Sequence, residues 1–150
     1  MKLQTRAAFL ATMSCLFCKL AAGEIPSEKV MENDGAFAFL DIKPLRRGHI
    51  LVVPKRHAER FADMRLEDAR SVMDLAQRIA ARQRERLDAE GVTIAVNDGR
   101  AAGQEVMHVH VHLVPRAEAD GHGPIHRLFA GEKTELREGE LQEIGARLRA

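Results

Sequence analysis

Aromatic side chains are scarce in this chain of 150 residues, which has six phenylalanines and neither tryptophan nor tyrosine. A surface that stacks successive nucleic-acid bases on aromatic rings is therefore not expected. The chain also lacks an excess of charge, because 23 basic residues are balanced by 22 acidic ones. This balance gives no basis for bulk electrostatic binding to nucleic acid or to an anionic membrane, so neither is expected as a partner.

Long hydrophobic runs are missing as well. No stretch approaches the roughly 18 consecutive apolar residues that a membrane helix needs. The first residues carry two cations and a short apolar patch, which superficially suggests a secretion signal but is shorter and weaker than one. We expect residues 1–12 to be a disordered or unpacked extension before a natural start at Met13. Residues 13–150 are then enough for a single domain with a core of its own.

Cysteine is limited to Cys15 and Cys18. A pair of thiols at this C-x-x-C spacing, in a chain with no other cysteine, is typical of a reducing compartment, where such a pair binds a metal or carries out redox chemistry. The cysteine usage therefore favours a cytoplasmic protein.

The hydrophobic pattern predicts an α+β fold around an antiparallel sheet. Strands are expected at 30–31, 36–41, 49–53, 92–96 and 106–114, and the Asn33-Asp34-Gly35 turn favours a hairpin between the first two. Apolar residues at helical spacing predict one long helix over 66–87, and short helices are expected at 16–22 and 140–148. Because the strands do not alternate with helices, the sheet is expected to be antiparallel.

Three of the seven histidines alternate with apolar residues within the segment VMHVHVHLV at 106–114. Successive side chains of a strand point to opposite faces of its sheet. We therefore expect His108, His110 and His112 to line one face, while Met107 and the aliphatic residues between the histidines cover the core side. Three imidazoles on one face are not the pattern of a solvated surface.

The three histidines are not expected to share one metal ion. The first and third lie roughly 13 Å apart along a strand, whereas Zn–N bonds are about 2 Å long. The three histidines are therefore expected to have different roles. One imidazole would be structural, and the others would act as a nucleophile or as donors to an anion. Cys15, Cys18 and two imidazoles would complete a closed tetrahedral Zn²⁺ site, although a redox dithiol has the same spacing.

The histidine row resembles the signature of the histidine triad (HIT) family, in which three histidines alternate with apolar residues. Further segments are similar to the bacterial branch of this family that is related to the Hint nucleotide hydrolases: CLFCKLAAGEIP at 15–26, FLDIKP at 39–44, GHILVVPKRH at 48–57, VNDG at 96–99 and AGQ at 102–104. The likeness covers a core of about 13–116 and leaves a variable tail over 117–150. It implies a HIT-like fold with about five antiparallel strands, one long helix and short helices.

The resemblance also implies an activity. It indicates a nucleotide-binding hydrolase or transferase that acts at the α-phosphate of a nucleotide conjugate, such as a nucleoside phosphoramidate. His110 would attack the phosphorus and form a nucleotidyl-histidine that water hydrolyses. His112 would contact phosphate oxygens, and His49 would support the hydrogen bonds of the triad. In zinc-bearing relatives the structural metal takes the positions that correspond here to Cys15, Cys18, His57 and His108.

The remaining family positions define an expected pocket for a purine nucleotide. Asp41 would bind the ribose hydroxyls. Apolar residues would wall the base, at Leu16, Phe17, Leu20, Phe39 and Ile42. Side chains and backbone amides would hold the phosphate beside His110 and His112, at Asn97, Gly103, Gln104, Glu105 and Val106. Family members form a homodimer whose sheets join edge to edge. Hint hydrolases usually carry a hydroxyl residue where this chain has Glu105, which leaves its preferred leaving group open.

Three other functions stay open at this point. A dinucleoside polyphosphate hydrolase would use the same family chemistry on a different substrate. A non-catalytic nucleotide- or partner-binding module would use the same pocket, although a pure binder has no need of a nucleophile. A metallohydrolase would hold a catalytic zinc ion on the triad itself.

Overall fold

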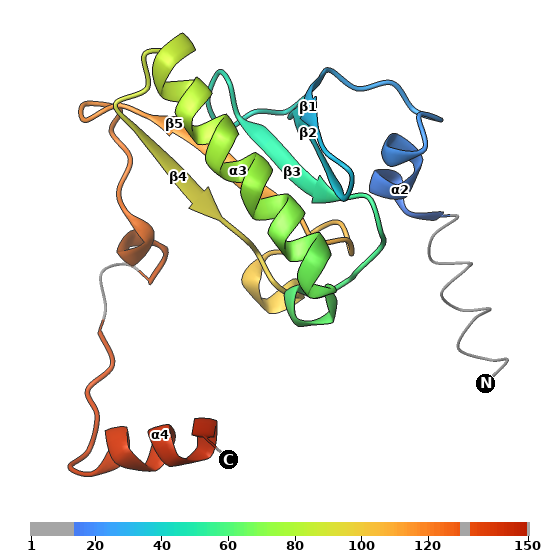
Figure 1. Cartoon of the computed structure of the whole chain (residues 1–150). Helices are drawn as coiled ribbons and strands as arrows, with labels where there is room; N and C mark the ends of the chain where they lie inside the picture. Colours follow the sequence, from blue (N-terminus) through green and yellow to red (C-terminus); the bar gives the residue numbers. More distant parts are fainter. Residues whose placement is uncertain (1–13, 130–132, 150) are drawn as a thin grey trace, which may run out of the picture. The chain divides into compact units, whose positions relative to one another are not determined.

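The apolar runs of the sequence form a five-stranded antiparallel sheet in the computed structural model, which describes residues 14–129 and 133–149 (Figure 1). The strands lie in the order β1-β2-β3-β5-β4. Their bounds are β1 (Lys29–Glu32), β2 (Ala36–Leu40), β3 (Ile50–Pro54), β4 (Gly91–Ala95) and β5 (Val111–Arg116). The prediction of an α+β fold with an antiparallel sheet is confirmed. By its contacts the chain divides into two units, Met1–Glu118 and Ala119–Ala150. The expected extension at 1–12 lies outside the described residues.

The predicted hairpin joins β1 to β2. The side chain of Asn33 closes the turn, because its Oδ1 accepts the backbone N–H groups of Gly35 at 3.2 Å and Ala36 at 2.8 Å. Asparagine favours turns for this reason, since its amide oxygen replaces a backbone acceptor. The register then pairs Glu32 with Phe37.

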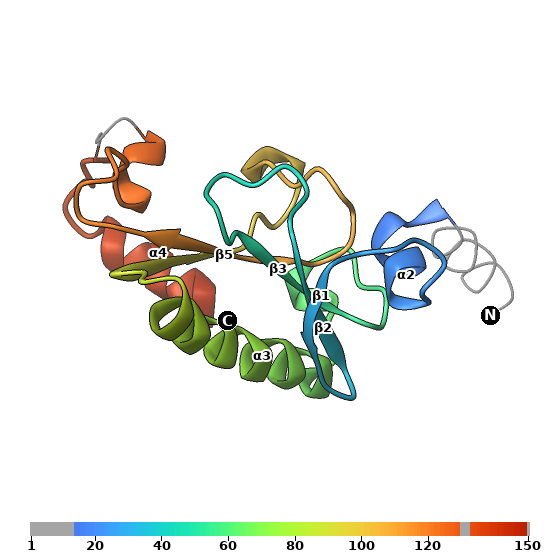
Figure 2. The ribbon, with the colours of Figure 1, turned by 90° about the horizontal axis from the view of Figure 1, so that it is seen from above.

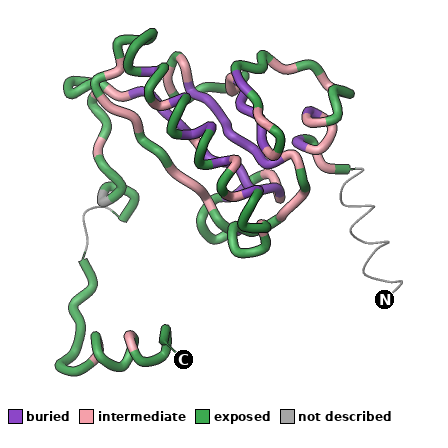
Figure 3. The backbone as a smooth tube through the Cα atoms, viewed as in Figure 1, coloured by how far each residue is buried: buried purple, intermediate pink, exposed green. Residues whose placement is uncertain are grey.

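The long predicted helix is α3 (Leu66–Arg86), and it covers one face of the sheet (Figure 2). Its apolar stripe of Val72, Leu75, Ala76 and Ile79 packs on alternate residues of the central strands, including Ile50 and Val52 of β3. The buried residues run along these strands and recur along α3 (Figure 3). This face holds the larger part of the hydrophobic core.

The short helix α2 (Leu16–Ala21) packs on part of the opposite face, against residues of β2 and β3. The intervening residues of β3, Leu51 and Val53, point to this side, where they pack with Phe17 of α2. Two short 3₁₀ turns complete the first unit, η1 (Phe61–Asp63) and η2 (Arg100–Ala102). The face toward α2 is the one on which the histidine row projects.

The predicted strand over 106–114 is wrong in its first half, because β5 begins only at Val111 and then continues to Arg116. Neighbouring strands offer no ladder before that point: β4 ends at Ala95, opposite His112, and β3 pairs with β5 only from Val111 to Leu113. Instead, the N–H of Val109 donates to the carbonyl of Ala58 at 2.8 Å. In this irregular segment Met107 is half-buried, whereas His108 and Val109 are both buried.

The second unit contains the turn η3 (Ile125–Phe129) and the helix α4 (Glu140–Arg149), which confirms the short helix predicted near the end of the chain. None of the described residues of α4 is buried. Across the residues that the structure describes, no helix combines the length and the apolar character needed to span a membrane.

Candidate functional site

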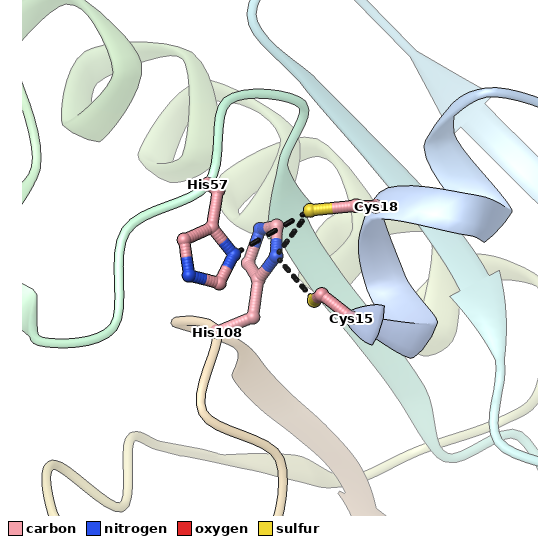
Figure 4. A group of neighbouring side chains, drawn as sticks. All are labelled: Cys15, Cys18, His57 and His108. Carbon is pink, nitrogen blue, oxygen red and sulfur yellow. Dashed lines mark hydrogen bonds between the residues drawn. The ribbon is translucent and has the colours of Figure 1, made fainter. Parts of the chain in front are cut away.

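A cluster of four metal-binding side chains lies beside α2, where three separate segments meet (Figure 4). Cys15 and Cys18 come from the start of α2, His57 from the loop after β3, and His108 from the segment before β5. The Sγ atom of Cys18 lies 3.4 Å from Nδ1 of His57 and 3.5 Å from Nδ1 of His108. The Sγ atom of Cys15 lies 3.3 Å from the same nitrogen of His108. All four candidate ligand atoms lie within 4.8 Å of one another.

This arrangement suits zinc. Zn–S bonds of about 2.3 Å and Zn–N bonds of about 2.0–2.1 Å, at a tetrahedral angle, place sulfur and nitrogen about 3.5 Å apart. The orientation of His108 also fits a ligand, because its Nε2–H donates to the carbonyl of Pro54 at 2.8 Å and leaves the lone pair of Nδ1 facing the sulfurs. Histidines that bind metals typically fix their second nitrogen in this way. Two thiols and two imidazoles form the closed donor set of a structural zinc site.

The electrostatics of the cluster also favour a cation. Burial, followed by the neighbouring Cys15, raises the pKa of the Cys18 thiol to about 12. Burial also lowers the pKa of His108 to about 4, so that its imidazole is neutral, as a ligand must be. A bound divalent cation would stabilise the thiolates that burial disfavours.

His110 follows at the next position of the row and is 7% exposed. Its Nδ1 lies 2.8 Å from the carbonyl oxygen of His108. A carbonyl oxygen only accepts hydrogen bonds, so Nδ1 carries the proton and the lone pair of the neutral ring is on Nε2. The ring of Phe17 packs edge-on against His110, with 5.2 Å between their centroids. The fixed tautomer leaves His110 with a free nucleophilic nitrogen.

His112 is held by His49, which is 2% exposed at the foot of β3. The N–H of Leu45 donates to Nδ1 of His49 at 3.2 Å, which places the proton of His49 on Nε2. That nitrogen lies 3.0 Å from Nδ1 of His112. His112 therefore accepts at Nδ1 and carries its own proton on Nε2, a buried atom that has no hydrogen-bond partner among the described residues. The Nε2–H of His112 is therefore available as a donor near His110. The ring centroids of His110 and His112 are 4.9 Å apart.

Both histidines of this pair are neutral at physiological pH. Burial lowers the pKa of His112 to about 4, and the neighbouring His110 and His49 act in the same direction. Burial likewise lowers the pKa of His49, which the carboxylate of Asp41 opposes. Oδ2 of Asp41 is 3.5 Å from Nδ1 of His49, beyond the usual hydrogen-bond range.

The structure brings some of the expected base-pocket residues together and leaves others apart. Phe17, Leu20 and Phe39 belong to one buried cluster next to the histidine row. Asp41 is partly buried beside His49. Leu16 is 45% exposed, and Ile42 is 91% exposed. These two side chains are therefore open to solvent and are not part of the buried cluster.

The loop expected at the phosphate end is held by Gln104, which is 4% exposed. Its Oε1 accepts the N–H of Gly99 at 2.7 Å, and its Nε2 donates to the carbonyls of Glu59 at 2.9 Å and Val106 at 3.0 Å. Gly103 adopts a left-handed conformation at φ 90°, which favours glycine. Asn97 lies next to Gly103, and Glu105 is exposed. In this structure the Gln104 side chain fixes the loop.

Sequence reasoning missed the backbone groups that set these tautomers. The amide of Leu45 and the carbonyl of Pro54 each determine which nitrogen of a histidine is free. Pro54 stands in a segment that carries the family resemblance and Leu45 directly follows another, but a backbone group leaves no trace in the pattern of side chains. Only the folded positions of the loops reveal them.

Comparisons with known proteins agree with this geometry. The model of the HIT domain matches residues 22–119. The Hit protein of Bacillus subtilis is 37% identical over 134 residues, which cover 89% of this chain and 90% of that protein. The adenosine 5'-monophosphoramidase of Saccharomyces cerevisiae is 38% identical over 105 residues, 70% of this chain and 64% of that one.

Solved structures show the same likeness. A zinc-bound histidine triad family protein from Mycobacterium smegmatis is 42% identical with a TM-score of 0.70, covering 73% of this chain and 80% of that one. A protein from Streptococcus mutans is 35% identical with a TM-score of 0.80, covering 91% of this chain and 83% of the other. The sheet and helices described above match these structures.

Proposed function

Because the chain belongs to the histidine triad (HIT) family, we propose that it is a hydrolase or transferase that cleaves a nucleotide conjugate, such as a nucleoside phosphoramidate, at its α-phosphate. Two similar proteins support a hydrolase: the yeast relative is named an adenosine 5'-monophosphoramidase, and a similar structure from Legionella pneumophila is named a HIT family hydrolase. The observation that carries the proposal is the fixed tautomer of His110, which frees its Nε2 and whose ring centroid lies 4.9 Å from that of His112.

The first chemical step is an attack by His110. The lone pair of Nε2 forms a bond to the α-phosphorus, and the bond from phosphorus to the leaving group breaks. The leaving group departs with the electron pair and takes up a proton from solvent water. The proton stays on Nδ1, which donates it to the carbonyl of His108, and this hydrogen bond stabilises the ring as it gains positive charge. Neutral imidazole is a competent nucleophile near pH 7, and a covalent intermediate divides one difficult displacement into two easier ones.

The second step is hydrolysis. Water attacks the phosphorus of the nucleotidyl-histidine and loses a proton to solvent. The P–N bond to His110 breaks, its electron pair returns to Nε2, and the nucleoside monophosphate is released. In both steps His112 donates its Nε2–H to a phosphate oxygen, and His49 holds His112 in the tautomer that makes this donation available. A donor aimed at the oxygen where negative charge develops stabilises the transition state more than the bound substrate.

The nucleotide itself would lie along the buried α2 face. We propose that Asp41 binds the ribose hydroxyls, that Phe17 and Phe39 contact the base, and that backbone amides of the loop held by Gln104 contact the phosphate. Phe17 joins these parts, because its ring touches both His110 and Phe39. The other expected pocket residues, including Leu16 and Ile42, remain predictions of the resemblance.

Zinc would act as a structural cross-link held by Cys15, Cys18, His57 and His108, and it would supply a fixed tie between the start of α2 and the histidine row. His108 serves two sites at once, because its ring faces the thiols while its backbone carbonyl binds the nucleophile. The metal cluster therefore bears on catalysis through the position of that carbonyl.

The proposal is tested by replacing the nucleophile. We expect His110→Ala to abolish turnover of adenosine 5'-phosphoramidate while the variant still binds adenosine monophosphate. His122→Ala, at an exposed histidine of the second unit, is the matched control and should keep full activity. Activity that survives in His110→Ala would overturn the mechanism. A panel of nucleotide substrates that includes dinucleoside polyphosphates identifies the leaving group. If no substrate of the panel is turned over faster than in buffer alone, the chain is instead a non-catalytic binding module.

We also propose a homodimer that works in the cytoplasm. The family resemblance implies pairing of sheets at their edges, and β4 is an edge strand that pairs only with β5 and carries Ile94 at 50% exposure. An edge strand offers unpaired backbone groups to a second chain. Light scattering of the full chain should give twice the mass of one chain. A monomer at micromolar concentration would contradict this part of the proposal.

A further inference from the structure

The polar side chain of Gln83 interrupts the apolar stripe on the buried side of α3. Leu75, Ile79 and Gln83 follow one another at four-residue spacing along the buried side of α3, and Gln83 is 1% exposed. Glutamine is seldom buried to this extent in proteins. Its Nε2 donates to the carbonyl of Gly48 at 2.9 Å and to the carbonyl of Leu113 at 3.0 Å. These carbonyls belong to the residues next to His49 and His112.

The carbonyl of Gly48 needs a hydrogen-bond donor that strand β5 does not supply. The ladder between β3 and β5 ends at the pair Ile50 and Leu113. Beside Gly48 lies Pro115, since a Cβ atom built on Gly48 would be 3.4 Å from Pro115 Cγ. Proline has no N–H, so it cannot donate to Gly48 as the next residues of a regular ladder would. The side chain of Gln83 takes that place and ties the two diverging strands together.

Gln83 does this from the face opposite the histidines. It sits on α3, and the alternation of β3 and β5 turns Ile50 and Leu113 toward that helix. His49 and His112 project from the same strands to the other side, where Nε2 of His49 and Nδ1 of His112 lie 3.0 Å apart. Gln83 therefore lies on the other side of the sheet from the imidazoles, but it holds the backbone from which both of them extend.

We propose that Gln83 is a positioning residue of the active site. By binding the carbonyls of Gly48 and Leu113, it sets the separation of the strands that carry His49 and His112, and so preserves their hydrogen bond. This inference rests on the proposed function in one respect, the use of the His112 Nε2–H on a phosphate oxygen. The tie itself is a property of the ligand-free chain.

A purely space-filling role fits the observations less well. Oε1 of Gln83 is buried and has no hydrogen-bond partner among the described residues. A buried polar atom without a partner destabilises a fold, and an apolar side chain of similar length would fill the same space without that penalty. The two donations to Gly48 and Leu113 are what the amide adds over such a side chain.

The test compares Gln83→Met with Ile79→Val in the full-length, zinc-loaded protein. Methionine keeps the length and unbranched shape of glutamine but donates no hydrogen bond. Ile79→Val is the matched control, because it removes one buried methyl group from the same stripe of α3 without touching the amide. Thermal unfolding and zinc content show that each variant is folded and loaded before the site is measured.

The decisive measurement is the nitrogen–nitrogen scalar coupling across the hydrogen bond between His49 and His112, recorded by NMR without ligand. We expect the coupling in the wild type and in Ile79→Val, and its loss in Gln83→Met. In turnover assays Gln83→Met should lower kcat about tenfold and change KM less than about threefold, because the His112 donation matters most in the transition state.

Two results would overturn the inference: a wild type without the coupling, or a folded Gln83→Met protein that keeps both the coupling and its kcat. If the methionine variant does not fold, Gln83→Leu is measured instead, because its buried apolar side chain also donates no hydrogen bond. A wild type that shows the coupling but turns over no nucleotide would refute the proposed function alone, since the coupling is read without substrate.

Discussion

His108 and His112 stand four residues apart in one row of imidazoles, and burial lowers the pKa of each to about 4. Their ring nitrogens are nevertheless used in opposite ways. His108 gives its Nε2–H to the carbonyl of Pro54 and turns a lone pair on Nδ1 toward two thiols. His112 accepts from His49 at Nδ1 and turns an N–H on Nε2 into the site. The first ring suits a cation, and the second suits an anion.

The difference teaches that the inner partner of a histidine decides its chemistry. A backbone carbonyl can only accept, so it forces a lone pair onto the far side of the ring. A neighbouring imidazole that donates forces a proton there instead. His110, between them, follows the first rule, because the carbonyl of His108 holds its Nδ1–H and frees Nε2. Residue type and burial alone do not distinguish the three.

The largest effect that we expect concerns the metal site at His108, the first histidine of the row. Replacing both thiols, in Cys15→Ser/Cys18→Ser, should abolish zinc binding and lower the free energy of unfolding by on the order of 3–5 kcal/mol, as loss of a structural metal does. Metal analysis and denaturant unfolding measure the two effects. A chelator should destabilise the wild type to a similar extent and leave the double variant unchanged. Equal zinc content in both proteins would refute the metal site.

Substitution of His112, the last histidine of the row, should lower activity without changing the zinc content. His112→Ala removes the donor to the phosphate and should lower kcat about 100-fold, the effect of losing one donor to a developing negative charge. Zinc content should stay at the wild-type level, because His112 is not one of the four clustered residues. His57→Ala is the mirror variant and should lose zinc affinity. If His112→Ala released the metal, the two ends of the row would not be separable.

A smaller effect is expected at the residue that sets the tautomer of His112. His49→Ala should lower kcat about tenfold, because His112 loses the donor at Nδ1 and no longer keeps its proton on Nε2. Glutamine has an N–H at a similar reach, so His49→Gln should stay within about threefold of the wild type. Steady-state kinetics of both variants give the comparison. Equal loss in the two variants would show that His49 acts by its shape and not by donation.

The last effect is a dependence of stability on pH, which is confined to acid conditions. The pKa of His112 is lowered from 6.5 to about 4 in the folded chain. Below pH 6.5 the unfolded chain takes up a proton that the folded chain does not, so this group makes the fold less stable as the pH falls from about 6.5 to about 4. The free energy of unfolding of the wild type should therefore fall relative to that of His112→Asn as the pH is lowered from 7 to 4. A constant difference across this window would contradict the lowered pKa.

Much of this site was predictable from the sequence because its ligands are side chains at regular spacing. The C-x-x-C pair and the alternating histidines indicated a division between metal binding and catalysis, and the family resemblance assigned Cys15, Cys18, His57 and His108, which the structure brings together. The strand boundary was less predictable. Alternation continues through His108 and Val109, but a strand also needs neighbours, and β4 ends opposite His112.

The sequence by itself determined the chemistry that is available: two thiols, a row of imidazoles that alternates with apolar residues, and the apolar periods that build a sheet beneath one long helix. Only the tertiary structure decided which nitrogen of each ring is free. That choice depends on the amide of Leu45, on the carbonyl of Pro54 and, as we infer, on the tie of Gln83 behind the sheet. The physical reason is that a tautomer is fixed by a hydrogen-bond partner, and these partners are brought within reach by folding and not by position along the chain.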